Sequence, residues 1–176
     1  MTVNLSTLDA ILTRFETLKN KESAASRFLS FAVEASWTTG KWENLEDCLN
    51  LCAKQDAVDF NLGIGSALYA LRQRKESTDR AYTEKSQTFK GIINDLRLNI
   101  ARSLTANSVA SLQSCHDDML RLHALADVEA IAEVGAGNSS SMDLPSALSR
   151  RLDVLGGYIA DKQYLLGLRR AAMELS

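Results

Sequence analysis

The residues best suited to act as nucleophiles, bases or metal ligands lie close together in the second half of the chain. Cys115 and His116 are adjacent, Asp117 and Asp118 follow, and His123 comes seven residues after His116. On a helix that spacing places the two histidines roughly on one face, where a metal or a cysteine nucleophile would need a partner from another element. Neither the His-Glu-x-x-His motif nor the Glu-x-x-His motif of di-iron bundles occurs here. The pattern therefore favours His123 packed at a helix contact and His116 nearer solvent.

Two further motifs are weaker candidates for a site. Cys48 and Cys52 are four residues apart and share a helix face, but a structural zinc site needs four ligands and usually a Cys-x-x-Cys pair. Small cysteines inside a helical core are the simpler explanation. Gly63 and Gly65 form a short glycine motif that lacks both a third glycine and a preceding strand, so it does not indicate a nucleotide site.

Charged residues also have structural explanations. The basic pairs Arg150-Arg151 and Arg169-Arg170 could meet acidic partners, although we expect solvated helix faces. Three acidic residues fall where a helix begins and its dipole favours negative charge: Glu43, Glu46 and Asp47. Nothing in the sequence assembles an active site, so we predict no catalytic, cofactor-binding or metal-ligating residue in this chain.

The composition predicts one helical domain. The chain has 176 residues, a length typical of a single domain, and its 45% hydrophobic content is enough to build a core. One proline leaves long stretches free to form helices. A net charge of −2 gives no electrostatic sign of nucleic-acid binding. Three cysteines in a chain of this size argue against a disulfide scaffold and favour a reducing compartment, and no apolar run has the length of a membrane span.

Apolar residues recur at helical spacing throughout, and no stretch alternates as a strand would. We therefore predict an all-α fold of about eight helices, in which tetratricopeptide-like hairpins stack as an α-solenoid over residues 1–176. The densely charged residues 74–87 are either a loop or a solvated helical extension. Residues 135–143 are expected to form a mobile loop. Pro145 suits the first turn of a seventh helix, whose core face we place on Leu148, Leu152, Leu155 and Ile159, before a last helix that carries Leu165 and Leu168.

The most informative local pattern is a corner between the second and third helices. A helical pattern runs into Trp37, a short turn contains Gly40, and a second pattern begins at Trp42 and continues through Leu45. Glycine provides the left-handed backbone that commonly ends a helix. The pattern predicts an αα-hairpin with a tryptophan on each side of the turn, and such a hairpin needs neighbours to bury both faces.

Four segments, in this order, give the chain a family resemblance. The corner EASWTTGKWENLEDCL resembles a hairpin in the FAT domain of phosphatidylinositol 3-kinase-related kinases, most closely the ATR-type DNA-damage checkpoint kinases. Three later segments are similar to the same family: NLGIGSALYALRQR, IINDLRLNIARSLTANSVASLQSCHDDMLRLHALADVEAI and RLDVLGGYIADKQYLLGLRRAAMEL. The resemblance covers most of the chain, from about Phe28 to Leu175.

The resemblance implies that the chain is a scaffold fragment of a larger nuclear serine/threonine kinase. No kinase signature occurs in these residues, so catalysis, with ATP and magnesium, would belong to a domain elsewhere in the parent protein. The expected partners are proteins: the parent's own kinase domain, a regulatory subunit or a second copy of the kinase. We expect no direct contact with nucleic acid or membrane and no small-molecule substrate.

Two other functions remain open at this stage. A free-standing tetratricopeptide-type adaptor would use the same hairpins to bind a peptide, and a complete solenoid would then present a polar outer face on its last helix. That helix, which carries Leu166 and Met173, is apolar on more than one side and favours the fragment. The third possibility is a small helical-bundle enzyme that uses Cys115 and His123.

Overall fold

The computed structural model describes residues 5–18, 22–52, 59–77, 79–106, 112–137 and 143–176. Within these ranges the chain forms eight helices and no strand, which confirms the all-α, solenoid-like expectation. No helix in these ranges is long and apolar enough to cross a membrane. The helices are α1 (Leu5–Leu18), α2 (Glu22–Thr39), α3 (Trp42–Cys52), α4 (Phe60–Glu76), α5 (Asp79–Ala106), α6 (Leu112–Gly135), α7 (Leu144–Val154) and α8 (Ile159–Leu175).

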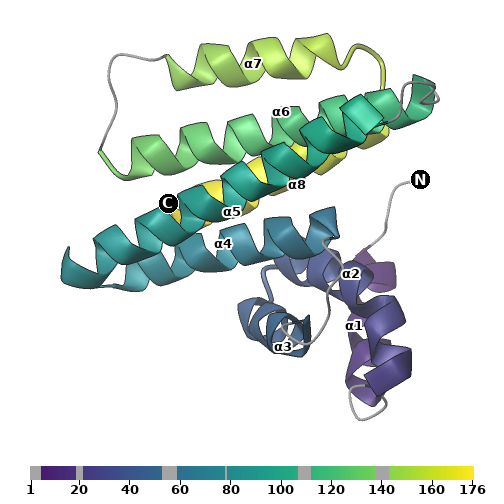
Figure 1. Ribbon diagram of the computed structural model, residues 1–176. Helices are drawn as coiled ribbons and strands as arrows, with labels where there is room; N and C mark the ends of the chain where they lie inside the picture. The colour runs from purple at the N-terminus through teal and green to yellow at the C-terminus, as the bar shows by residue number, and fades with distance from the viewer. Residues whose placement is uncertain (1–4, 19–21, 53–58, 78, 107–111, 138–142) are drawn as a thin grey trace.

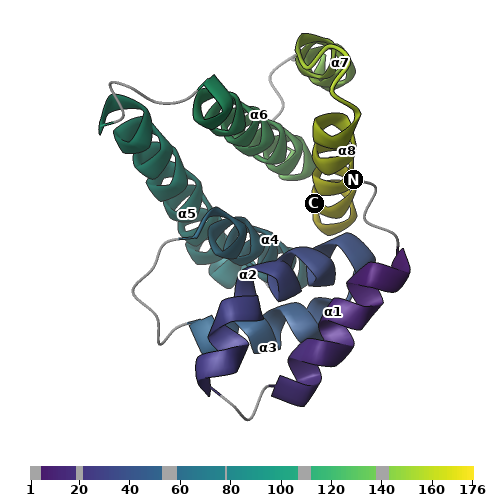
Figure 2. The same ribbon diagram turned by 90° about the vertical axis from the view of Figure 1, so that its right-hand side faces the viewer.

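Neighbouring helices pack as hairpins, and the hairpins stack. Helix α1 packs on α2, α2 on α3 and α4, α4 on α5, and α5 on α6 (Figure 1). The first three helices gather at one end of the molecule, and α7 is the outermost helix at the other end (Figure 2). One buried apolar cluster runs through α1 to α8, and a smaller one lies between α1 and α2, so each hairpin depends on the next for burial.

Helix α8 adds contacts that a purely sequential stack would not have. It packs on α6 and returns to α4 and α2. The Trp37 and Tyr164 rings meet edge to face with their centroids 6.0 Å apart. Arg170 donates a hydrogen bond to the carbonyl of Thr38 at 2.6 Å, and Lys75 donates to the carbonyl of Glu174 at 2.7 Å. The last helix therefore ties the first hairpins to the end of the stack.

The corner between α2 and α3 is a Schellman turn. Gly40 has φ +70°, its amide donates to the carbonyl of Trp37, and the Lys41 amide donates to the carbonyl of Ser36. Trp37 is only 2% exposed and Leu45 is fully buried, while Trp42 is partly buried against the main core. The turn therefore places one indole inside the core and the other at its margin.

Glycines also decide where α7 ends. Ile159 was expected on the core face of the seventh helix, and that prediction is wrong. Helix α7 ends at Val154, and Gly156 adopts φ +57°, a conformation that ends a helix readily. Ile159 instead begins α8 and is 70% exposed, whereas Leu155 is buried as expected.

Within the charged stretch 74–87, the described residues 74–76 and 79–87 are helical. Helix α4 continues to Glu76, where its C-terminal residues include Arg74 and Lys75, and α5 begins at Asp79. The expected loop at 135–143 begins one residue later, after Gly135 ends α6, and Asp143 caps α7. Residues 138–142 of that loop lie outside the described part of the chain.

We predict that Gly40→Ala destabilises the protein by about 1 kcal/mol, since a side chain there forces an alanine into the left-handed region. A Cβ at Gly40 would meet no atom within 4 Å, so the cost is one of backbone conformation alone. Gly91 is the matched control because it is helical and exposed, and its Cβ position is equally open. Gly91→Ala should be neutral or stabilising by up to about 1 kcal/mol in urea denaturation. Equal effects of the two substitutions would contradict the turn geometry.

Candidate functional site

The cysteines of α3 belong to the core. Cys48 is fully buried, and Cys52 packs against the same cluster. Burial, together with the negative charge of Asp59, raises the pKa of the Cys52 thiol, which keeps it protonated and a poor nucleophile or metal ligand. Among the residues the structure describes, no three His, Cys, Asp or Glu side chains gather to hold a metal ion.

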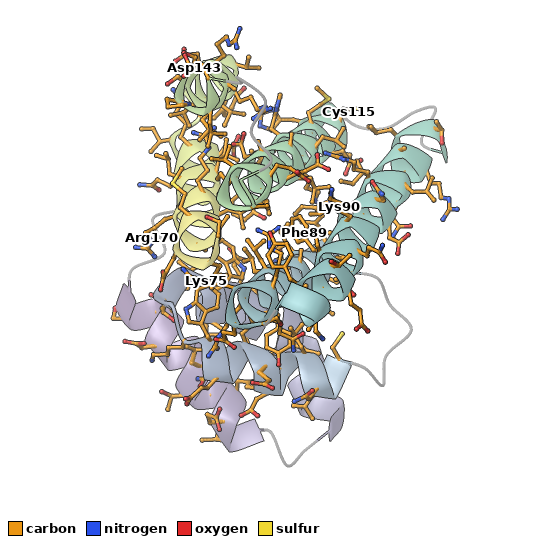
Figure 3. All side chains as sticks on the ribbon, turned by 90° about the vertical axis from the view of Figure 1, so that its left-hand side faces the viewer. Lys75, Phe89, Lys90, Cys115, Asp143 and Arg170 are labelled. Carbon is orange, nitrogen blue, oxygen red and sulfur yellow. The ribbon has the colours of Figure 1, made fainter. Side chains whose placement is uncertain are left out.

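His116, rather than His123, contacts a carboxylate. Its Nε2 lies 2.6 Å from Oδ2 of Asp161 in the first turn of α8, and its ring lies 4.9 Å from the ring of Tyr158. His123 is partly buried on α6. Cys115 lies near the start of α6, well away from the α7 end that Asp143 marks (Figure 3). The His116 contact joins α6 to the beginning of α8, which is a structural role.

The glycine motif allows close packing between helices. A Cβ on Gly63 would lie 2.4 Å from a Leu96 side-chain carbon, and one on Gly65 would lie 2.5 Å from Val33. Gly63 therefore lets α5 approach α4, and Gly65 lets α2 approach it. This packing accounts for both glycines without a nucleotide.

The two basic pairs are not simply solvated, and for Arg169 our expectation was wrong. Arg169 is 6% exposed, and its Nε donates to Oδ2 of Asp127 at 2.6 Å. Arg151 donates to the other oxygen, Oδ1, at 2.5 Å. Asp127 on α6 therefore accepts from α8 and α7 at once. Arg150 and Arg170 keep the expected exposed position, although Arg170 also donates to the Thr38 carbonyl.

Asp127 is the polar centre of this end of the molecule. Its carboxylate is completely buried, where an ionised group is tolerated only when its oxygens are paired. Arg169 also donates to the carbonyl of Leu148 at 2.8 Å, which extends the network into the α7 backbone. Sequence reasoning missed Asp127, although a single aspartate among the apolar residues Ala124, Leu125 and Val128 was a detectable signal.

A second buried arginine connects α4, α5 and α6. Arg74 is 4% exposed and donates to the carbonyl of Ala132 at 2.9 Å. Its guanidinium lies 5.5 Å from the ring centroid of Tyr82 and 5.9 Å from that of Phe89, within cation–π range. These contacts explain why one arginine of the charged stretch is buried: Arg74 donates to a carbonyl near the end of α6 and is covered by aromatic rings.

Between α4, α5 and α6 lies a polar cleft of about 290 Å³. Its polar groups already serve the fold. Asp59 caps α4 by accepting from the amides of Asn61 and Leu62, while Asp118 pairs with Arg121 at 3.1 Å. The Arg121 guanidinium also lies 5.3 Å from the Phe60 ring centroid. These contacts account for Asp59, Asp118 and Arg121 at the cleft without a catalytic role.

Two ionisable groups near the α2–α8 interface are perturbed by burial. Burial raises the pKa of the Glu34 carboxyl above 4.5, although its hydrogen bond from Asn61 at 3.1 Å opposes the shift. Burial also raises the pKa of the Tyr164 hydroxyl, and the negative charge of Glu34 adds to the effect. Both shifts mark a desolvated helix interface.

With this geometry established, comparison with known proteins defines the class. The family model of the FAT domain matches residues 29–176, which is most of the chain, and the chain therefore belongs to the FAT domain family. This confirms the expected FAT segment of a phosphatidylinositol 3-kinase-related kinase. The chain is also similar to protein kinase rad3 of Schizosaccharomyces pombe, with 26% identity over 155 residues. That similarity covers 88% of this chain and about 6% of the length of rad3. No solved structure matches the chain.

We predict that Asp127→Asn costs about 3–5 kcal/mol of unfolding free energy, because it leaves Arg169 buried without its charge partner. Glu129→Gln is the matched control. Glu129 lies on the same helix and accepts two hydrogen bonds from Arg97 in a half-exposed ion pair. Loss of this ion pair should lower the free energy of unfolding by about 1 kcal/mol or less. Similar small losses in urea denaturation for both variants would contradict the role assigned to Asp127.

Glu34→Gln should become more stable relative to the wild type as the pH rises from 4 to 7. The Glu34 carboxyl has a higher pKa in the folded protein than in the unfolded protein. Its contribution to stability is complete below the unfolded-state pKa and is lost as the pH rises through the folded-state pKa. A glutamine side chain does not titrate, so at this position it adds no pH dependence to the free energy of unfolding. Urea denaturation of both proteins across this range measures the difference, and a constant difference would contradict the desolvation of Glu34.

Proposed function

We propose that this chain is a non-catalytic scaffold segment of an ATR-like serine/threonine protein kinase that acts in DNA-damage checkpoint signalling. Membership of the FAT family over most of the chain, together with similarity to about 6% of a much longer protein kinase, is the observation that carries the proposal. In such a parent, the stacked helices would brace the kinase domain, and catalysis with ATP and magnesium would take place elsewhere.

The helical packing supports a bracing role. Helix α8 contacts α2, α4 and α6 together, so it joins the two ends of the segment through packed helices. Asp127 is paired with Arg151 and Arg169, and the buried Arg74 donates to a backbone carbonyl. These features suit a rigid spacer between moving parts of a large enzyme.

The proposed partners are proteins: the parent's own kinase domain, a regulatory subunit or a second copy. Helix α8 offers an outward face on which Leu166 is 48% exposed and Met173 is 50% exposed. These residues are seven apart, two helical turns along the same side. The capping helix of a complete solenoid would be polar at these positions. We propose nuclear localisation for the parent protein and no direct contact with nucleic acid.

The proposal predicts that Leu166→Glu with Met173→Glu, introduced into the parent kinase, lowers its stimulated activity at least severalfold. The isolated chain with the same changes should keep its melting temperature, since both side chains are already half exposed. Arg150→Glu is the control, because Arg150 is exposed on α7, away from this face. Deletion of the whole segment should leave a poorly regulated or unstable kinase. A parent whose regulated activity survives the deletion would refute the proposal.

A free-standing peptide-binding adaptor is the second candidate. The cleft between α4, α5 and α6, with Asp59 and Arg121 at its edge, is the feature that favours it. An adaptor would bind a peptide without any kinase attached, so a peptide-bound complex of the native protein at about 19 kDa would support this alternative.

A further inference from the structure

Helix α7 is attached to the molecule by fewer contacts than the other helices of its half. It packs mainly on α6 and lies at the outside of the stack (Figures 1 and 2). Its buried residues are Ala147 and Leu148, whereas Val154 in its last turn is 71% exposed. Few buried apolar groups mark a region that can open before the rest of a fold.

Polar contacts supply much of the remaining attachment. Arg151 of α7 donates to Asp127 of α6, and Arg169 of α8 donates to the Leu148 carbonyl. If α7 moved away, Asp127 would still accept from Arg169, so its buried charge would not be left unpaired. Separation of α7 therefore breaks the Arg151–Asp127 and Arg169–Leu148 contacts and preserves the Arg169–Asp127 ion pair.

The connection to α8 has the properties of a hinge. Gly156 has φ +57°, and a Cβ at Gly156 or Gly157 would meet no atom within 4 Å. Immediately after these glycines, α8 is fixed to α6 by the His116–Asp161 contact and by the Tyr158 ring against His116. Motion of α7 can therefore occur at the glycine pair without movement of α8.

Helix α7 can also persist as a unit during such a motion. Asp143 accepts from the Ser146 amide and hydroxyl at its N-terminus, and Pro145 occupies the first turn (Figure 3 marks Asp143). These hydrogen bonds lower the pKa of Asp143, which keeps the cap ionised. The cap belongs to α7 itself and does not depend on α6 or α8.

We propose that α7 is a strap that opens and closes as one unit about Gly156 and Gly157, with the Arg151–Asp127 ion pair as its latch. In the closed state Leu148 and Leu152 are packed against the main core. In the open state those leucines and the facing side of α6 are exposed to solvent. Opening is favoured by salt or by any group that competes for Arg151, because the Arg151 side chain retains 22% exposure.

Hydrogen exchange followed by mass spectrometry on the purified protein tests the strap. Amides of residues 144–154 should exchange faster than those of α6 and α8, and Arg151→Met should accelerate exchange in 144–154 by about tenfold while the other two helices change little. Arg150→Met is the matched control, since it removes the neighbouring arginine from an exposed position, and should have no effect.

Three results would overturn the proposal. Equal exchange rates in α6, α7 and α8 would show that α7 opens only with global unfolding. Equal acceleration of all three helices by Arg151→Met would show that the ion pair stabilises the whole fold, and no acceleration at all would show that it is not a latch. If Arg151→Met does not fold, the same measurement is made on the wild-type protein at two salt concentrations. Raising sodium chloride from 0.1 to 1 M must then accelerate amide exchange in residues 144–154 and not in α6 or α8.

Discussion

The buried carboxylate of Asp127 is the constraint on which the arrangement of the C-terminal helices depends. A fully buried charge requires partners, and Asp127 receives one from α7 and one from α8. Apolar surfaces alone tolerate small rotations of one helix on another. The hydrogen bond from Arg169 to Asp127 fixes the rotation and register of α8 on α6, and Arg151 joins α7 to the same carboxylate. The position of α8 then determines which residues reach α2 and α4.

From that position, α8 connects parts of the chain that are far apart in sequence. Trp37, near the end of α2, packs against Tyr164 of α8. Next to it, Arg170 of α8 donates a hydrogen bond to the carbonyl of Thr38. Glycines at 63 and 65 let α4 approach its neighbours closely enough to complete the core. These contacts join the first helices to the last, as the proposed scaffold role requires.

Local sequence signals predicted the parts of the fold that local physics decides. Apolar residues at helical spacing predicted the helices, and Gly40 predicted the corner at which α2 ends. The same reasoning missed features that depend on distant partners. Arg169 looks like a surface residue until Asp127, 42 positions earlier, is placed beneath it. Ile159 was assigned to the wrong helix because the sequence did not show that the chain leaves the helix at Gly156. That depends on the backbone angles of the glycines, which apolar periodicity does not report.

The size of the native polypeptide tests the central claim, that this chain is a scaffold segment of a large kinase, most directly. An antibody raised against these residues and used to probe a nuclear extract should detect one band far above the 19.3 kDa of this chain. The band should disappear when the reading frame that encodes the segment is disrupted. A single specific band near 19 kDa would contradict the account, since a native protein of that size would contain no kinase domain.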